Sequence, residues 1–178
     1  MKVISTKFEG VSIVRPDVFS DSRGFFVETF QKVRYQAALN INDEFVQDNY
    51  SFSKKNVLRG MHFQKQYPQG KIVRVMRGEI FDVVVDIRKD SSTFGQWEGF
   101  ILSDVNQEQL WVSPGFAHGF LVLSEYADFE YKCTDYYRPD DEYCLLWNDP
   151  TVNIQWPLNS LLPVLSEKDS QGLRLTQI

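Results

Sequence analysis

Short segments that alternate between apolar and polar residues are the feature that most limits what this chain can fold into. Two of them, 71–77 and 79–87, follow each other around Gly78, which predicts a tight strand–turn–strand unit. More segments of the same kind follow at 96–102, 108–113, 118–123 and 128–134. Since alternation with a period of two is typical of half-buried strands, this spacing predicts an all-β sandwich or barrel such as a jelly roll.

The remaining segments fit the same fold class, with a few short helices. Residues 11–15 and 25–30 are predicted to be early strands. Residues 31–39 are predicted to form a short helix that stops at Asn40. A second short helix is expected near 166–171.

Composition narrows the possible functions. The 178 residues have the size of one domain, so residues 1–178 are predicted to form a single jelly-roll domain. A net charge of −5, with no strongly basic stretch, argues against a nucleic-acid partner. No apolar run has the length of a signal peptide or a membrane span. Two cysteines, Cys133 and Cys144, are too few for a disulfide scaffold and are expected to be buried thiols in a reducing cytoplasm.

Residues 45–64 gather polar side chains that a structural hairpin rarely carries. The segment is predicted to form two strands joined by a polar turn. Gln47 and Asn49 are two residues apart, so they share one face of the first strand. Arg59 and His62 lie in the second strand. This group predicts one wall of a ligand pocket.

His62 has two interpretations. A histidine in a strand is commonly a hydrogen-bonded core residue, but here its neighbours include a charged residue. Arg59 and His62 are three apart and would face opposite sides of a regular strand, so we predict a bulge at Gly60 that turns both to one side. The second histidine, His118, lies in VSPGFAHGF, which is either a tight corner between strands or the facing wall of the same pocket.

A metal site is not predicted. Metal-binding β-barrels need several histidine or carboxylate ligands at close spacing. Gln64 stands where a second histidine would follow His62, and the chain has two histidines in all.

Lys71 and Tyr131 are further candidates with ordinary alternatives. Lys71 opens a strand, where a lysine is usually solvated. Tyr131 shares one strand face with Phe129 and Cys133, and this face is expected to point inward. A buried tyrosine hydroxyl needs a partner, so Tyr131 is either a structural donor or a proton carrier, and the sequence does not favour one over the other.

Seven segments, taken in order, resemble the dTDP-4-dehydrorhamnose 3,5-epimerase family. They are DSRGFFVETF, FVQDNYSFSKKNVLRGMHFQ, PQGKIVRVMRGEIFDVVVDIR, QLWVSPGFAHGFLVL, YKCTDYYRPDDE, LLWNDP and LSEKD, and they span nearly the whole chain. The resemblance implies a cupin-type jelly roll that is usually dimeric, and it suggests that N-terminal residues cross to a partner subunit. It implies a substrate, dTDP-4-dehydro-6-deoxy-D-glucose, that is inverted at C3 and C5 to dTDP-4-dehydro-L-rhamnose, the precursor of dTDP-L-rhamnose. No redox or metal cofactor is implied.

The resemblance also assigns catalytic roles. His62 matches the base that removes a proton next to the ketone, and Asp169 matches the carboxylate that orients it. Lys71 matches the cation near the C4 oxygen, where it would stabilise an enolate. Tyr131 matches the acid on the opposite face of the sugar, which inversion requires.

Other positions match substrate contacts of the family. They are Arg23, Glu28, Gln47, Asn49, Arg59, His118, Glu142 and Lys168, with Phe19 and Phe26 as aromatic residues that stack on the base or line the pocket. The guanidinium groups of Arg23 and Arg59 suit the paired oxygens of a diphosphate, although Arg23 and Glu28 by themselves also fit a surface salt bridge. Asp48 is carried over as a contact although a regular strand points it away from its neighbours.

Three other functions remain as alternatives. A relative that inverts one centre of a dTDP-4-keto-deoxysugar would keep the same base and acid. A non-catalytic sugar-nucleotide-binding cupin would be expected to lack His62, Tyr131 or Asp169, which are all present. A metal-dependent cupin oxygenase or isomerase is disfavoured by the missing ligands.

Overall fold

The structure, a computed structural model, describes residues 1–158 and 160–178. Its strands are β1 (Lys2–Ser5), β2 (Val11–Arg15), β3 (Val18–Asp21), β4 (Gly24–Val27), β5 (Gln47–Lys54), β6 (Leu58–Gln64), β7 (Lys71–Arg77), β8 (Glu79–Asp86), β9 (Trp97–Ser103), β10 (Gln109–Val112), β11 (Phe116–Val122), β12 (Tyr126–Cys133) and β13 (Glu142–Cys144). Its α-helices are α1 (Lys32–Leu39) and α2 (Glu167–Ser170), with 3-10 turns at Pro139–Asp141 and Leu175–Gln177.

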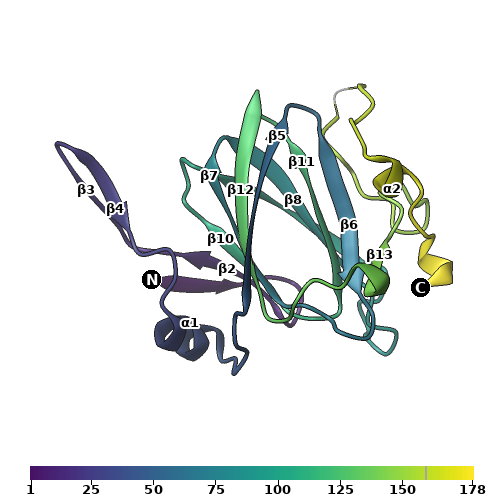
Figure 1. The fold of residues 1–178 in the computed structure, drawn as a ribbon, viewed down its shortest axis with the longest axis horizontal. Helices are drawn as coiled ribbons and strands as arrows, with labels where there is room; N and C mark the ends of the chain where they lie inside the picture. The colour runs from purple at the N-terminus through teal and green to yellow at the C-terminus, as the bar shows by residue number, and fades with distance from the viewer. Residues whose placement is uncertain (159) are drawn as a thin grey trace.

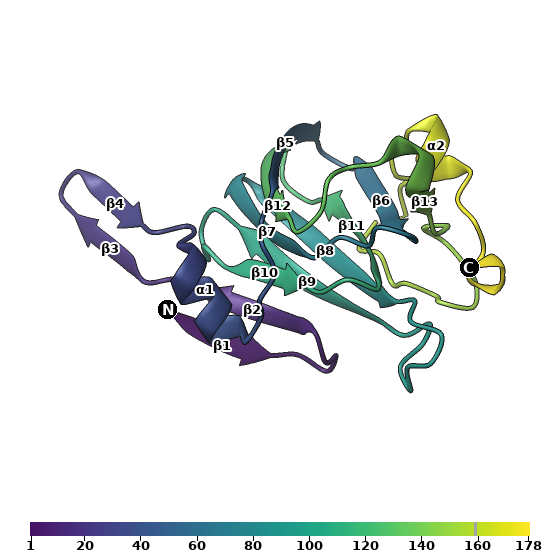
Figure 2. The same ribbon diagram turned by 60° about the horizontal axis from the view of Figure 1, so that its bottom comes forward.

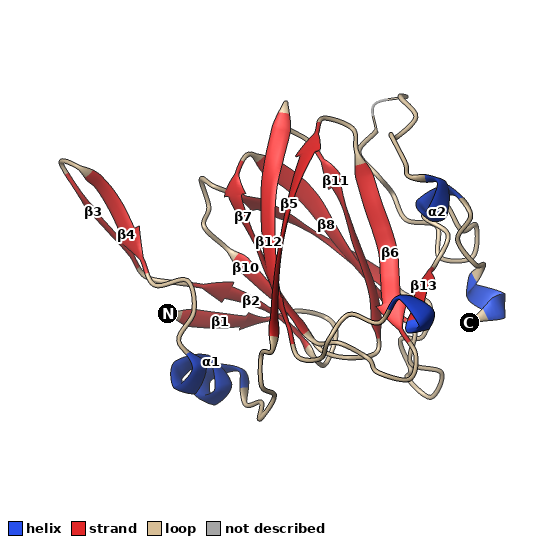
Figure 3. Cartoon of the chain, viewed as in Figure 1, coloured by secondary structure: helices blue, strands red, loops and turns tan. Residues whose placement is uncertain are grey.

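Two antiparallel sheets form the body of the molecule (Figures 1 and 3). One has the strand order β1-β2-β10-β7-β12-β5 and the other β13-β6-β11-β8-β9. Strands dominate and the helices are short, so the predicted all-β jelly roll is confirmed. Both expected helices are present, and Asn40 ends α1 in the left-handed conformation, with a φ of 54°.

The two predicted hairpins are wrong in their pairing. The strands within 45–64, β5 and β6, belong to different sheets, and so do β7 and β8, which flank Gly78. In a jelly roll, successive strands pass from one sheet to the other, so a tight turn here is a corner between layers. As a consequence, the polar residues of β5 and β6 face one another across the interior.

The interior between the sheets is filled by alternate residues of facing strands. Val73 and Val75 of β7 meet Val84 of β8, Phe120 of β11 and Phe129 of β12 in one buried cluster. Phe120 and Phe129 pack with ring centroids 4.4 Å apart. This apolar cluster fills one part of the space between the sheets, and polar side chains line the rest.

The outer faces of both sheets are partly covered. The C-terminal segment covers the sheet that contains β8, which explains why β8 is buried along almost its whole length. Val83 and Val85 point away from the interior and pack under Val152 and Ile154 of the C-terminal segment. On the other sheet, Tyr35 of α1 covers the outer face, and its single hydroxyl proton has two acceptors within reach, the Thr29 carbonyl oxygen and Gln109 Oε1. The C-terminal layer matters for the site because it carries α2.

A two-stranded arm, β3 and β4, leaves the body altogether (Figures 1 and 2). Its pairs include Phe19 opposite Phe26. Both rings are largely exposed, at 63% and 68%. Apolar area of this kind on a projecting arm is typical of a surface that contacts another molecule.

No helix in the described ranges combines the length and the apolar character needed to span a bilayer.

Candidate active site

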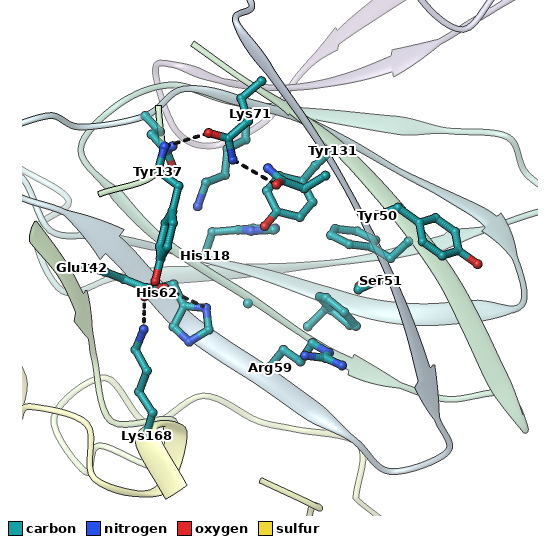
Figure 4. A pocket seen from close by; sticks show the side chains of 16 residues that line it. Tyr50, Ser51, Arg59, His62, Lys71, His118, Tyr131, Tyr137, Glu142 and Lys168 are labelled. Atoms are coloured by element: carbon teal, nitrogen blue, oxygen red, sulfur yellow. Dashed lines mark hydrogen bonds and ion pairs between the residues drawn. The ribbon is translucent and has the colours of Figure 1, made fainter. Parts of the chain in front are cut away.

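A cavity of about 410 Å³ opens between the two sheets (Figure 4). Its walls come from both layers, so residues far apart in sequence meet there. The lining residues are Gln47, Asn49, Tyr50, Ser51, Arg59, His62, Gln69, Lys71, His118, Gly119, Phe120, Phe129, Tyr131, Tyr137, Glu142 and Lys168. The predicted convergence of the two histidine-bearing segments on one pocket is confirmed.

Arg59 and His62 reach the same cavity because β6 is irregular between them. His62 pairs with His118 and Arg59 with Phe120, so β6 has one residue more than β11 between the two pairs. Gly60 has a φ of 127°, and a Cβ there would lie 2.5 Å from the Cα of Gly119. The predicted bulge at Gly60 is thus confirmed.

His62 is oriented by Asp169. His62 Nε2 donates a hydrogen bond to Asp169 Oδ1 over 2.6 Å, and Asp169 is buried on the short helix α2, which Ser166 caps. Burial alone would raise the pKa of Asp169, but the hydrogen bond and charge of His62 outweigh it and hold that pKa below its usual value. With Nε2 occupied, Nδ1 is the nitrogen that keeps a free lone pair.

Glu142, Lys168 and Tyr137 form a polar rim beside His62 (Figure 4). Glu142 Oε1 lies 3.9 Å from His62 Nδ1. Glu142 Oε2 accepts hydrogen bonds from the Tyr137 hydroxyl, at 2.7 Å, and from the Lys168 ammonium group. Tyr137 was absent from the sequence-based site; its only sequence signal is its place in YKCTDYYRPDDE.

Lys71 and Tyr131 stand on neighbouring strands of the other sheet. The Lys71 ammonium nitrogen lies 6.0 Å from the centroid of the Tyr131 ring. Burial lowers the pKa of Lys71, while the nearby Cys133 and Asp82 act in the opposite direction. Burial, assisted by Cys133, raises the pKa of Tyr131 to about 12. Tyr131 is therefore protonated at neutral pH and able to donate its proton.

A second histidine–carboxylate pair lies deeper in the cavity. His118 Nε2 lies 2.9 and 3.0 Å from the two carboxylate oxygens of Asp82. Asp82 has no exposed surface, and this burial raises its pKa, against the influence of His118 and Lys71. Asp82 was missed in the sequence, although an acid within the apolar run IFDVVVDI is a usable signal.

Asp48, among the predicted contacts, lies outside the cavity. It points to the outer face of β5 and forms an ion pair with Lys132. The reason is the strand period of two, which places Gln47 and Asn49 inside and Asp48 outside.

Arg23, Glu28, Phe19 and Phe26 also lie away from this cavity. Three of them are on the projecting arm, where Arg23 pairs with Asp21, while Glu28 pairs with Arg34 of α1. The chain's own cavity is therefore lined without them.

One group of described side chains has the donor atoms of a metal site. A nitrogen of His62, the sulfur of Cys144 and a carboxylate oxygen of Asp169 all lie within 4.8 Å of one another.

Chemically, the cavity places an oriented imidazole on one sheet and a half-buried lysine with a protonated phenol on the other. Such an arrangement is able to remove a carbon-bound proton, stabilise the resulting negative charge and return a proton from another side.

Comparison with known proteins points the same way. A sequence model described as dTDP-4-dehydrorhamnose 3,5-epimerase matches residues 5–177. A protein of that name from Salmonella typhimurium is 53% identical over 178 residues, which cover 99% of this chain and 97% of the relative. The crystal structure of dTDP-6-deoxy-D-glucose-3,5-epimerase from Legionella pneumophila in complex with dTDP-4-keto-L-rhamnose is 52% identical, with a TM-score of 0.96, and the match covers 99% of this chain and 94% of that one. A 3'-monoepimerase from Streptomyces bikiniensis in complex with dTDP-quinovose is 31% identical, with a TM-score of 0.91 and coverage of 97% and 87%.

Proposed function

This chain belongs to the dTDP-4-dehydrorhamnose 3,5-epimerase family, and we propose that it inverts C3 and C5 of dTDP-4-dehydro-6-deoxy-D-glucose to give dTDP-4-dehydro-L-rhamnose, in dTDP-L-rhamnose biosynthesis. The observation that carries this proposal is the meeting of the His62–Asp169 pair with Lys71 and Tyr131 around one cavity. The reaction moves protons and no net electrons, so its balance calls for no redox cofactor.

His62 acts as the base. A neutral imidazole has one ring nitrogen without a proton, and this nitrogen is able to accept one. The hydrogen bond to Asp169 leaves His62 Nδ1 free to take the proton from the carbon next to the ketone. Once His62 is charged, the Asp169 carboxylate stabilises the imidazolium.

Lys71 and Tyr131 complete the proton transfer. As the proton leaves, negative charge develops on the C4 oxygen, and the Lys71 ammonium group stabilises it in a cavity of low dielectric. Tyr131 then protonates the carbon from the face opposite His62. Two groups on opposite sides are needed because a single group tends to restore the original configuration.

The remaining cavity residues bind the nucleotide sugar. Arg59 meets the diphosphate with a guanidinium that is exposed at the pocket mouth and held by Ser53 at 2.8 Å. The other contacts proposed on this wall and rim come from Gln47, Asn49, His118, Glu142 and Lys168.

Incubation with dTDP-4-dehydro-6-deoxy-D-glucose in D2O tests the proposal directly. We expect deuterium at both C3 and C5, measured by NMR, because each inversion exchanges a carbon-bound proton with a group that equilibrates with solvent. Label at a single carbon would make the chain a mono-epimerase, the activity named for the Streptomyces bikiniensis neighbour. Tight dTDP binding without any label would make it a binding module.

The exposed arm is best explained by a second copy of the chain. We propose a homodimer in which Phe19, Arg23 and Phe26 of the arm, with Glu28 at its base, complete the nucleotide end of the partner's cavity. The Arg23 side chain is 88% exposed and therefore available to an anionic ligand outside its own subunit. Exchange of an arm in a twofold dimer also buries the exposed phenylalanine rings.

Subunit complementation tests this arrangement. We expect Arg23→Ala and His62→Ala proteins each to be impaired alone. A heterodimer isolated with two different tags should recover roughly half of the wild-type activity, since one of its two sites then carries neither change. If each cavity used its own arm, both sites of the heterodimer would be defective and no activity would return.

We also place the chain in the cytoplasm as a single domain. Both cysteines are buried and unpaired in the structure, which suits a reducing compartment.

A further inference from the structure

The thiol of Cys144 lies next to the proposed base, His62, on the neighbouring strand. Cys144 of β13 pairs in register with His62 of β6, and its sulfur lies 3.9 Å from Asp169 Oδ1. The same oxygen accepts the 2.6 Å hydrogen bond from His62 Nε2. Cys144 and Asp169 are 6% and 4% exposed, so the surrounding layers fix two of these three groups.

The three donor atoms match the preferences of a zinc-class ion. Sulfur, imidazole nitrogen and carboxylate oxygen bind Zn²⁺ at about 2.0–2.3 Å, which places tetrahedral ligands roughly 3.4–3.6 Å apart. The structure already holds the sulfur and the oxygen within a few tenths of an ångström of that spacing, and the nitrogen and oxygen need to separate by less than 1 Å. The nitrogen and the sulfur lie within 4.8 Å of each other and close on the metal through rotation of the His62 side chain. The His62 side chain is 29% exposed toward the cavity, which provides an entry path and space for water as a fourth ligand.

We propose that His62, Cys144 and Asp169 form an inhibitory site for soft divalent ions such as Zn²⁺, and that occupancy switches off the base. The metal site stands on the geometry of the three side chains. Its effect on activity depends on the base role proposed above for His62.

The inhibition follows from where the protons go. The metal replaces the proton that Nε2 donates to Asp169, and a neutral imidazole bound through Nε2 carries its proton on Nδ1. Nδ1 is the nitrogen that otherwise takes the substrate proton, so its lone pair is lost. Glu142 Oε1, 3.9 Å from Nδ1, is placed to stabilise this tautomer. The Cys144 thiol releases one proton to solvent as it becomes a thiolate ligand.

The chemistry of the donors also predicts selectivity. Thiolate ligands favour Zn²⁺, Cd²⁺ and Co²⁺, whereas Mg²⁺ and Ca²⁺ prefer sites made of oxygen.

The test pairs an activity measurement with a direct binding signal. Epimerisation is measured with increasing Zn²⁺ in the intact protein, in Cys144→Ala and in the matched control Cys133→Ala, which removes the other buried thiol. Binding is followed by the thiolate-to-cobalt charge-transfer absorption on titration with Co²⁺. We expect Zn²⁺ but not Mg²⁺ to inhibit, a chelator to reverse the effect, and Cys144→Ala to raise the half-inhibiting Zn²⁺ concentration by at least about tenfold, because loss of even an outer-shell partner costs 10- to 100-fold.

The cobalt band should appear in the intact protein and in Cys133→Ala, and disappear in Cys144→Ala. Equal zinc sensitivity of all three proteins, or a cobalt band that survives Cys144→Ala, would overturn the site. Absence of both inhibition and band would do the same. A Cys144-dependent cobalt band, found together with no epimerase activity in any of the three proteins, would support the metal site and refute the proposed function. Failure of the metal site and failure of the proposed function are therefore distinguishable.

Discussion

Replacing His62 with alanine should slow solvent exchange at C3 and C5 by about 10²–10⁴-fold, the usual contribution of a positioned general base. The change removes the imidazole that Asp169 orients, and the other histidine of the cavity, His118, is held against Asp82 instead. The measurement is the initial rate of deuterium incorporation in D2O, followed by NMR at saturating substrate.

Binding of dTDP provides the control for this variant. The nucleotide has no ketone-bearing sugar, so its affinity, measured by calorimetry, should stay within about twofold of the intact protein, in keeping with a loss of transition-state interactions. Exchange at an undiminished rate would show that another group takes the proton. Loss of both exchange and dTDP binding would indicate a damaged fold rather than a missing base.

Lys71→Met should lower kcat by about 10²–10³-fold with little change in KM, the effect expected when a group that stabilises an oxyanion is removed. Methionine keeps much of the side-chain volume and removes the charge. Lys55→Met, an exposed lysine in the turn after β5, is the matched control and should leave kcat unchanged. A rise in KM alone would assign Lys71 to ground-state binding.

A double variant separates the electrostatic effect from damage to the core. Without Lys71, the buried Asp82 loses one of the two neighbouring groups that lower its pKa and keeps only His118. We expect this loss to lower the melting temperature of Lys71→Met. Adding Asp82→Asn removes the carboxylate, so the melting temperature of the double variant should recover while its kcat stays low. Recovery of kcat in the double variant would show that Lys71 acts by balancing Asp82.

Local features of the fold were predictable from the sequence, whereas strand pairing was not. The face assignment of Tyr131 and Cys133, the bulge at Gly60 and the helix end at Asn40 each depend on neighbours in the chain. The partner of a strand depends on distant segments. A Gly78-type turn looks the same in the sequence whether it closes a hairpin or forms a corner between sheets.

The same division applies to the candidate site. The sequence, read through a family resemblance, placed His62, Lys71, Tyr131 and Asp169 at one cavity, where the structure brings them together. It did not indicate Asp82: the acid within the apolar run IFDVVVDI is a signal, but its partner His118, on the neighbouring strand β11, is known only from the fold. Cys144 was predicted to be a buried thiol, but its position next to His62 was not, since it follows from the pairing of β13 with β6.

The irregular backbone at Gly60 also bears on which ligands the cavity accepts. Arg59 and His62 lie on one strand, and the backbone between them packs so closely on β11 that a Cβ at Gly60 would lie 2.5 Å from the Cα of Gly119. If Arg59 binds the diphosphate, as proposed, the strand sets the distance between the diphosphate site and the base that acts on the sugar carbons. With that arrangement, we expect the number of phosphates between nucleoside and sugar to decide whether C3 and C5 reach His62.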